Sequence, residues 1–282
     1  MHIITSIRDI QGHIKKLKEN HATIGFVPTM GALHEGHLSL VREAKRKNDT
    51  VVVSIFVNAL QFGENEDFSH YPRTFENDCK LLSQEGVDMV FHPDAAKMYS
   101  KGFCTSVIPG HLENALCGKS RPGHFRGVAV VVLKLFNIVK PDIAYFGQKD
   151  FQQTVIIKRV VSDLNVDVII KILPTMRDQN GLALSSRNAY LSEVEKKDAL
   201  CLYKALTKAQ SMVQAGIQNT ENIVQEMEKI IHTTKSATID YISIVSPETL
   251  EEVPMAHSGD VAALAVRIGK TRLIDNVILL FS

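Results

Sequence analysis

The feature that most constrains the fold of this 282-residue chain is a continuous run of apolar, largely β-branched residues, TVVVSIFV, at positions 50–57. A strand that is apolar at every position is typical of a parallel sheet whose two faces are both covered by helices. Similar strand-like segments alternate along the chain with helical ones. The repeated β-α-β order predicts an α/β fold with a Rossmann-like, doubly wound parallel sheet.

The segments that should build this sheet are recognised by their periodicity and by the residues that end them. Strands are expected at residues 23–29, 50–57, 87–93, 142–147 and 166–174. Helices are expected at residues 38–48, 74–86, 127–139 and 151–164. The helix at 127–139 is apolar on most sides, so we expect it to be buried.

After Pro174 the character of the sequence changes. The stretch TMRDQNGLALSSRN at 175–188 is polar and rich in turn-forming residues. Two long amphipathic helices are expected near 192–215 and 219–233, followed by antiparallel strands at 239–246, 260–268 and 272–281. The sequence therefore predicts two domains, a Rossmann-like domain over 1–174 and a smaller C-terminal α+β domain over 175–282.

The charge balance and the cysteines restrict the partners and the compartment. Lys and Arg total 32 and Asp and Glu total 31, a net charge of +1, so neither nucleic acid nor membrane is an expected partner. No apolar run approaches the roughly 20 residues of a membrane helix, and the N-terminal MHIITSIRDI is too polar for a signal peptide. Scattered cysteines, none in a C-x-x-C pair, predict buried, reduced thiols and a cytoplasmic protein; they are Cys79, Cys104, Cys117 and Cys201.

Two histidines lie where a strand should meet a helix, in TMGALHEGHLSL at 29–40. His34 and His37 are three residues apart, so they share a face of the helix start. A helix N-terminus suits phosphate, and Gly31 and Gly36 would allow a ligand close to the backbone. The zinc alternative is weak, because the H-E-x-x-H motif places its histidines four residues apart. A purely structural histidine pair is the remaining alternative.

Polar side chains also follow the strand at 50–57. In FVNALQF, Asn58 and Gln61 each offer a hydrogen-bond donor and an acceptor without a charge. Such amides suit the hydroxyl and carboxylate groups of a small acid. The alternative is that they cap a turn or helix.

Two further stretches carry groups that suit a nucleotide. In GQKDFQQ, Lys149 can reach phosphates and Asp150 suits ribose hydroxyls, although a solvated loop is an equal alternative. In LALSSRN, Ser185, Ser186 and Arg187 form a phosphate-binding composition. The basic stretch KSRPGHFRG at 119–127 is either a solvated turn or a region that attracts anionic substrates.

These motifs together carry a resemblance to a known family. VPTMGALHEGHLSL resembles the H-x-G-H element of the nucleotidyltransferase superfamily. The chain is similar to the pantothenate synthetase (pantoate–β-alanine ligase) family over nearly its whole length, although the similarity is weak after about residue 200. Three further segments match that family in the same order: SIFVNALQFGENEDFSHYPRT, KSRPGHFRGVAVVVLKLFNIVKPDIAYFGQKDFQQ and GLALSSRNAYLS. The resemblance implies ATP-dependent ligation of pantoate and β-alanine through a pantoyl adenylate, releasing AMP and pyrophosphate.

The resemblance also implies roles for individual residues. His37 would be the proton donor, Gln61 would bind pantoate and β-alanine, Gln153 would bind pantoate, and Asn58 is grouped with the substrate residues. ATP would be bound by Met30, Gly31, Ala32, Leu33, His34, Glu35, Gly36, His37, Gly147, Gln148, Lys149, Asp150, Met176, Leu184, Ser185, Ser186 and Arg187.

Further implications concern the metal, the lid and the assembly. ATP chemistry implies Mg²⁺, for which Asp78 is the protein candidate, although Asn77 stands beside it where an acid is often found. Residues 1–174 would bind ATP and pantoate, residues 175–282 would act as a mobile lid, and the assembly would be a homodimer. The chain departs from the family pattern at Ala59, Val130 and Met176, where proline, threonine and valine are common.

Three rival functions use the same motifs. Another H-x-G-H nucleotidyltransferase would join a nucleotide to a phosphomonoester, but the Asn58 and Gln61 amides favour a carboxylic acid. A non-catalytic nucleotide sensor would not need both histidines, Lys149 and Arg187. An RNA-charging enzyme is disfavoured by the near-neutral charge.

Overall fold

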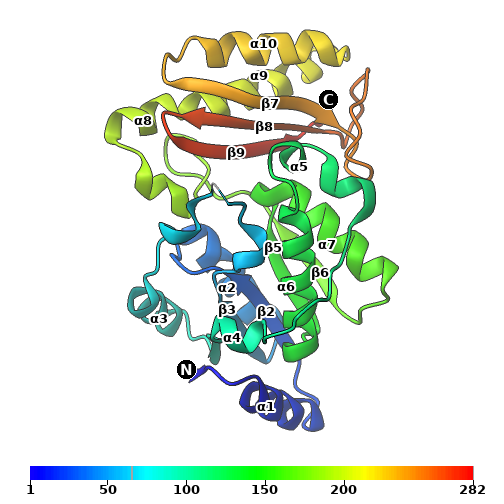
Figure 1. Cartoon of the computed structure of the whole chain (residues 1–282). Coiled ribbons are helices and arrows are strands. Elements are labelled where there is room, and N and C mark those ends of the chain that lie inside the picture. Colours follow the sequence, from blue (N-terminus) through cyan, green and yellow to red (C-terminus); the bar gives the residue numbers. More distant parts are fainter. Residues whose placement is uncertain (65, 282) are drawn as a thin grey trace. The chain divides into compact units, whose positions relative to one another are not determined.

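The computed structural model describes residues 1–64 and 66–281 and divides into two compact units (Figure 1). Unit 1 comprises Met1–Glu113, Arg121–Gly147 and Ile156–Pro174. Unit 2 comprises Asn114–Ser120, Gln148–Val155 and Thr175–Ser282. The last segment of unit 2 begins at the boundary expected from sequence, but unit 2 also includes two earlier segments that were expected in the first domain.

Unit 1 is built on a six-stranded, fully parallel sheet with the order β1-β4-β3-β2-β5-β6. The chain winds outward in one direction from β2 to β4 and in the other from β5 to β6, which confirms the doubly wound fold. The topological switch point lies between β2 and β5. The strands are β1 (His2–Ile4), β2 (Ile24–Thr29), β3 (Thr50–Ile55), β4 (Met89–Phe91), β5 (Ile143–Gly147) and β6 (Ile169–Leu173).

Helices cover both faces of this sheet, as the continuous apolar run in β3 predicts. Val52 packs into one apolar cluster with α1 and α6, whereas Val51 and Val53 pack into a second cluster with α2 and α3. Most of α6 is buried, as expected. The helices and 3-10 turns of unit 1 are α1 (Ile7–Glu19), α2 (Glu35–Lys47), η1 (Ala59–Gln61), η2 (Asp67–Ser69), α3 (Phe75–Gln84), α4 (Ala95–Met98) and α6 (His124–Val139); η3 (Gly110–Asn114) ends in unit 2.

Unit 2 is a three-stranded antiparallel sheet whose core lies against α9 and α10. Its strands are β7 (Ala237–Val245), β8 (Val261–Ile268) and β9 (Thr271–Ile278), which confirms the predicted antiparallel arrangement. The first predicted long helix is interrupted at Ala199. Other elements are α5 (Cys117–Ser120), η4 (Gln148–Asp150), η5 (Ser186–Tyr190), α8 (Glu193–Asp198), α9 (Leu200–Gln214) and α10 (Thr220–His232); α7 (Phe151–Asp163) starts in unit 2 and continues into unit 1.

Two predictions about the chain as a whole can be compared with the structure. Across residues 1–64 and 66–281, none of the helices has the length and apolar content needed to cross a bilayer. All four cysteines are free thiols. Cys117 and Cys201 are buried as expected, but Cys104 is exposed.

Candidate active site

The predicted site residues divide between the two units. Unit 1 contains Met30–His37, Asn58, Gln61, Asp78 and Gly147. Unit 2 contains Gln148–Asp150, Gln153, Met176 and Leu184–Arg187.

The turn after β2 is held in a left-handed backbone conformation by a buried carboxylate. Gly31 has a φ of +83° and Ala32 a φ of +49°, a region that costs a residue with a Cβ about 1–2 kcal/mol. Asp78 is fully buried and accepts hydrogen bonds from Ala32 N at 3.0 Å and Leu33 N at 2.9 Å. A Cβ at position 31 would lie 3.0 Å from Asp78 Oδ2. Gly31 and Asp78 together therefore fix the path of the chain into His34.

His34 and His37 lie side by side at the start of α2, with ring centroids 4.1 Å apart. His34 Nδ1 accepts a hydrogen bond from Gly36 N at 3.2 Å, and His37 Nδ1 accepts one from His34 N at 3.3 Å. A backbone N–H can only donate, so Nδ1 of each ring carries no hydrogen. Each neutral ring therefore has its N–H at Nε2. The first turn of α2 thus presents two imidazole donors of fixed tautomer where the helix dipole favours an anion.

Asn58 and Gln61 lie at the end of β3 and in η1, and both are buried. Asn58 Nδ2 donates to Gln61 Oε1 at 3.1 Å and to Gly127 O at 3.0 Å, while its Oδ1 accepts from Leu60 N at 3.3 Å. The amide nitrogen of Gln61 donates to Met30 Sδ at 3.1 Å. The structure therefore connects the FVNALQF segment directly to the turn after β2.

The fit of a magnesium ion can be tested at Asp78. Besides its two backbone donors, Asp78 Oδ1 accepts from Thr74 Oγ1 at 3.1 Å, and the side chain has no exposed surface. Mg²⁺ requires octahedral coordination and usually retains several waters. A carboxylate enclosed by internal donors does not fit this requirement. Within the described residues there is also no group of three or more His, Cys, Asp or Glu arranged to hold a metal.

In unit 2, a buried amide holds the loop that carries Lys149. Asn276 Nδ2 donates to the carbonyl oxygens of Gln148 and Lys149, each at 3.0 Å, and Asn276 Oδ1 accepts from Gln148 Nε2 at 3.2 Å. Asn276 N in turn donates to Asp275 Oδ1 at 2.8 Å, and Asp275 forms a two-pronged ion pair with Arg177 at 2.5 and 2.9 Å. The backbone of the Lys149 loop is therefore anchored to β9.

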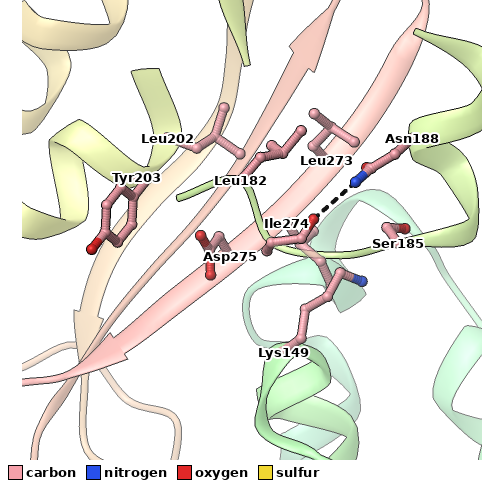
Figure 2. A pocket seen from close by; sticks show the side chains of 10 residues that line it. Lys149, Leu182, Ser185, Asn188, Leu202, Tyr203, Leu273, Ile274 and Asp275 are labelled. Carbon is pink, nitrogen blue, oxygen red and sulfur yellow. Dashed lines mark hydrogen bonds between the residues drawn. The ribbon is translucent and has the colours of Figure 1, made fainter. Parts of the chain in front are cut away.

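The serine-rich segment 184–187 lies beside this loop within unit 2. Lys149 and Ser185 both line a small cavity, shown in Figure 2, together with Asn188 and Asp275. Ser185 Oγ caps η5 by accepting from Arg187 N at 3.3 Å. Leu184 N donates to Met176 O at 2.9 Å, so the two residues expected to touch the nucleotide are neighbours.

The two adjacent glutamines at the start of α7 have different roles. Gln152 is buried; its Oε1 accepts from Cys117 N at 3.0 Å and its Nε2 donates to Ala115 O at 2.7 Å. This amide therefore holds the segment before α5. Gln153, the residue expected to bind pantoate, is half-buried.

The basic stretch at 119–127 is largely neutralised by carboxylates. Arg121 pairs with Glu66 at 2.5 and 2.7 Å, and Arg126 pairs with Glu113 at 2.7 to 3.0 Å. His124 Nδ1 lies 2.7 Å from Gln61 O. The stretch thus contacts the Gln61 segment, and its arginines form ion pairs with carboxylates of the same unit.

Sequence reasoning missed Asn276 and Gly127. The signal for Asn276 was a polar pair, Asp275–Asn276, inside an otherwise apolar strand, because buried polar residues need a partner. Gly127 carried no recognisable signal. A Cβ there would lie 2.1 Å from Leu60 O, so only glycine allows α6 to lie this close to η1.

Comparison with known proteins decides the family. A family model described as Pantoate-beta-alanine ligase matches residues 2–278. The chain belongs to the pantoate–β-alanine ligase family. Pantothenate synthetases from Caldicellulosiruptor bescii and Thermotoga petrophila are each 52% identical to it, covering 99% of the chain and 99% and 100% of those proteins.

Solved structures of this family have the same fold. Pantothenate synthetase from Thermus thermophilus aligns with a TM-score of 0.95 and 41% identity, covering 99% of this chain and 100% of that one. Pantoate-beta-alanine ligase from Francisella tularensis, complexed with "Beta-gamma ATP and Beta-alanine", aligns with a TM-score of 0.83 and 37% identity, covering 99% and 97%. The predicted function, an ATP-dependent ligation of pantoate and β-alanine that forms a C–N bond, is confirmed by membership of the family.

Proposed function

We propose that the chain makes pantothenate in two steps through a pantoyl adenylate. A carboxylate oxygen of pantoate attacks the α-phosphorus of ATP, and pyrophosphate leaves. The amine of β-alanine then attacks the acyl carbon, the C–O bond to AMP breaks, and the amine loses a proton as the amide forms. The observation that carries this proposal is that His34 and His37, at the start of α2, each accept a backbone hydrogen bond at Nδ1, which leaves the N–H of each neutral ring at Nε2.

His34 and His37 are suited to the first step because charge builds on the α-phosphate as the carboxylate attacks. Donors whose tautomer and position are already fixed stabilise that charge without reorganising during the reaction. We assign His37 as the donor to the α-phosphate and His34 as its neighbour in the same anion site. Met30–Leu33, Glu35, Gly36 and Gly147 would line the nucleotide site.

The remaining ATP contacts are assigned to unit 2. Lys149 and the Ser185–Arg187 segment supply a cation, two hydroxyls and a guanidinium, which suit phosphate oxygens. The hydrogen bond from Asn276 Nδ2 to Lys149 O supports this assignment, because it fixes the backbone of Lys149. Met176 and Leu184 would contact the nucleotide, with Gln148 in the same loop and Asp150 at the ribose. The lid role of residues 175–282 stays a prediction.

The acid and the amine are assigned to Gln61 and Gln153. Gln61 would bind both pantoate and β-alanine, and Gln153 would bind pantoate. The polar groups of Asn58 are already bonded within unit 1, so we propose that it acts on the substrates through Gln61.

Mg²⁺ would enter with ATP, held by phosphate oxygens and water, and would neutralise charge on the departing pyrophosphate. We assign no side chain to it, because the buried Asp78 carboxylate is bonded to Ala32, Leu33 and Thr74. Asp78 instead shapes the turn that leads into the two histidines.

A homodimer is supported by one edge of the unit 1 sheet. β6 is the last strand in the order, and within residues 1–64 and 66–281 it pairs with β5 alone; Ile169 on it is 65% exposed. An exposed apolar edge strand promotes association unless it is covered. Light scattering should give twice the 31.3 kDa of the chain; the mass of one chain at micromolar concentration would contradict the dimer.

A cytoplasmic location is proposed on the cysteines. All four thiols are free, including the exposed Cys104, and free thiols persist in reducing compartments. Fractionation of the cells that make the protein would test this, and recovery in the secreted fraction would contradict it.

Exchange between ATP and labelled pyrophosphate tests the proposed intermediate. Exchange should require pantoate and proceed without β-alanine, because the first step is complete before the amine reacts. Exchange in the absence of pantoate, or none in its presence, would contradict an adenylate. A stable dinucleotide-like product would instead indicate nucleotide transfer to a phosphomonoester.

A further inference from the structure

The orientation of the Asn58 amide is determined by two backbone groups, one of which can only donate a hydrogen bond and one of which can only accept one. Leu60 N–H can only donate, and it points to Asn58 Oδ1 at 3.3 Å. Gly127 C=O can only accept, and it lies 3.0 Å from Asn58 Nδ2. Turning the amide over would face oxygen to oxygen and nitrogen to nitrogen. Asn58 is 1% exposed, so water cannot compensate for such a mismatch.

Tyr99, at the end of α4, completes this arrangement. Its hydroxyl donates to Asn58 Oδ1 at 2.7 Å, the shortest hydrogen bond made by that amide. Burial raises the pKa of Tyr99 above its usual value, so the hydroxyl keeps its hydrogen at neutral pH. Tyr99 lies 41 residues from Asn58 in sequence, and nothing else in the site engages this hydroxyl among the described residues.

The fixed Asn58 amide in turn sets the orientation of Gln61. The second hydrogen of Asn58 Nδ2 points to Gln61 Oε1 at 3.1 Å, so the acceptor end of Gln61 is turned inward. Its amide nitrogen then faces Met30 Sδ at 3.1 Å. A thioether sulfur is only a weak acceptor, so an oxygen of a substrate could replace it.

We infer that Tyr99 and Asn58 are positioning residues that make Gln61 present its NH₂ group, as a hydrogen-bond donor, to an acceptor oxygen of pantoate. This inference rests on the proposed role of Gln61. It deepens that role, because it specifies which end of the amide meets the substrate and which residues determine it. A carboxylate or hydroxyl oxygen would be accepted there, and a group that could only donate would be rejected.

Comparing Gln61→Glu with Gln61→Ala tests directly whether Gln61 donates a hydrogen bond to pantoate. Glutamate can still accept from Asn58 with one oxygen, but its other oxygen would put a negative charge where the donor had been. Gln61→Ala should lower kcat/KM for pantoate about 10- to 100-fold, as expected for losing a hydrogen bond to a charged group. Gln61→Glu should be at least about tenfold worse than Gln61→Ala, with KM for ATP unchanged in both variants.

The positioning of Gln61 by Tyr99 through Asn58 is tested with the variant Tyr99→Phe, and Tyr145→Phe is its matched control. Tyr145 is another tyrosine of unit 1, fully buried where Tyr99 is half-buried, and its hydroxyl accepts a hydrogen bond from an asparagine, Asn48, at 2.8 Å. Each variant loses one hydroxyl that is hydrogen-bonded to an asparagine, but of the two tyrosines only Tyr99 is connected through its asparagine to Gln61. Tyr99→Phe should raise KM for pantoate about fivefold with KM for ATP unchanged, and Tyr145→Phe should change neither, at a similar shift in Tm.

The outcomes separate this inference from the function on which it rests. If Gln61→Ala left the use of pantoate unchanged, the proposed role of Gln61 would fail, and the inference with it. If Gln61→Ala impaired pantoate use but Gln61→Glu were no worse, the donor sense would be wrong. If Tyr99→Phe behaved like Tyr145→Phe, Tyr99 would have only a structural role. In these last two cases the proposed function would stand.

Discussion

Replacing His37 with alanine is expected to slow adenylation of pantoate about 10²- to 10³-fold, the usual cost of losing one fixed donor to a charged transition state. The Nε2–H of His37 would be lost from the site where charge builds on the α-phosphate. Pantoate binding should weaken far less, because this contact strengthens only in the transition state. Single-turnover formation of the adenylate measures the rate directly; an unchanged rate would remove His37 from the mechanism.

His37→Ala also removes the acceptor for His34 N, so a matched pair of variants is needed. The amide oxygen of His37→Asn occupies roughly the place of Nδ1 and can keep the 3.3 Å cap, but it provides no donor at Nε2. His37→Gln extends an amide toward the Nε2 position. We expect His37→Asn to be as slow as His37→Ala with the thermal stability of the wild type. His37→Gln should recover part of the rate.

Breaking the ion pair between Arg177 and Asp275 is expected to lower the free energy of unfolding more than any other substitution proposed for this chain. The Asp275 side chain is 1% exposed, and the guanidinium of Arg177 binds both of its oxygens. Arg177→Met would leave a buried carboxylate whose one remaining donor in the described part of the chain is Asn276 N. Removing one partner of a buried pair typically costs about 3–5 kcal/mol, which urea unfolding followed by circular dichroism would measure.

The pH dependence of this loss gives an independent check. Burial raises the pKa of Asp275, and Arg177 opposes that rise; without Arg177 the pKa should rise further. An acid whose pKa is raised on folding contributes stability below its ordinary pKa and loses it as pH rises through the folded value. The deficit of Arg177→Met should therefore grow as the pH rises above the folded-state pKa of Asp275 in the wild type, where the wild-type carboxyl is ionised and the carboxyl of the variant is still protonated. Adding Asp275→Asn should recover part of the loss; a pH-independent deficit would contradict this cause.

The fold was largely predictable because its strands are defined by local apolar patterns. Val51 to Val53 alternate between the two apolar clusters, and this burial on both faces is visible in the sequence as an unbroken apolar run. β1 was not predicted, because a strand of three residues is too short to show an alternating pattern. α1 was not predicted either, and within it only Ile10 and Ile14 are buried. The break at Ala199 leaves the helical pattern unchanged, so sequence could not locate it.

The candidate site was predictable in its residue types but less so in their roles. The clustering of His34 and His37 is local and was anticipated. Asp78 reaches Leu33 across 45 residues, and Asn58 reaches Gly127 across 69. Because no sequence pattern records which distant backbone groups a side chain satisfies, the sequence could not show that Asp78 and Asn58 are bonded to the backbone of other segments. Asp78 bonds to the turn that leads into His34, and Asn58 bonds to Gln61.

The measurement that tests the central claim most directly follows the oxygen atoms of pantoate. If the carboxylate attacks the α-phosphate and the C–O bond to AMP breaks in the second step, one carboxylate oxygen must leave with AMP. With both carboxylate oxygens labelled as ¹⁸O, mass spectrometry should find one ¹⁸O in each AMP and one in each molecule of the amide product. Unlabelled AMP, or label in inorganic phosphate with ADP as the product, would contradict a pantoyl adenylate.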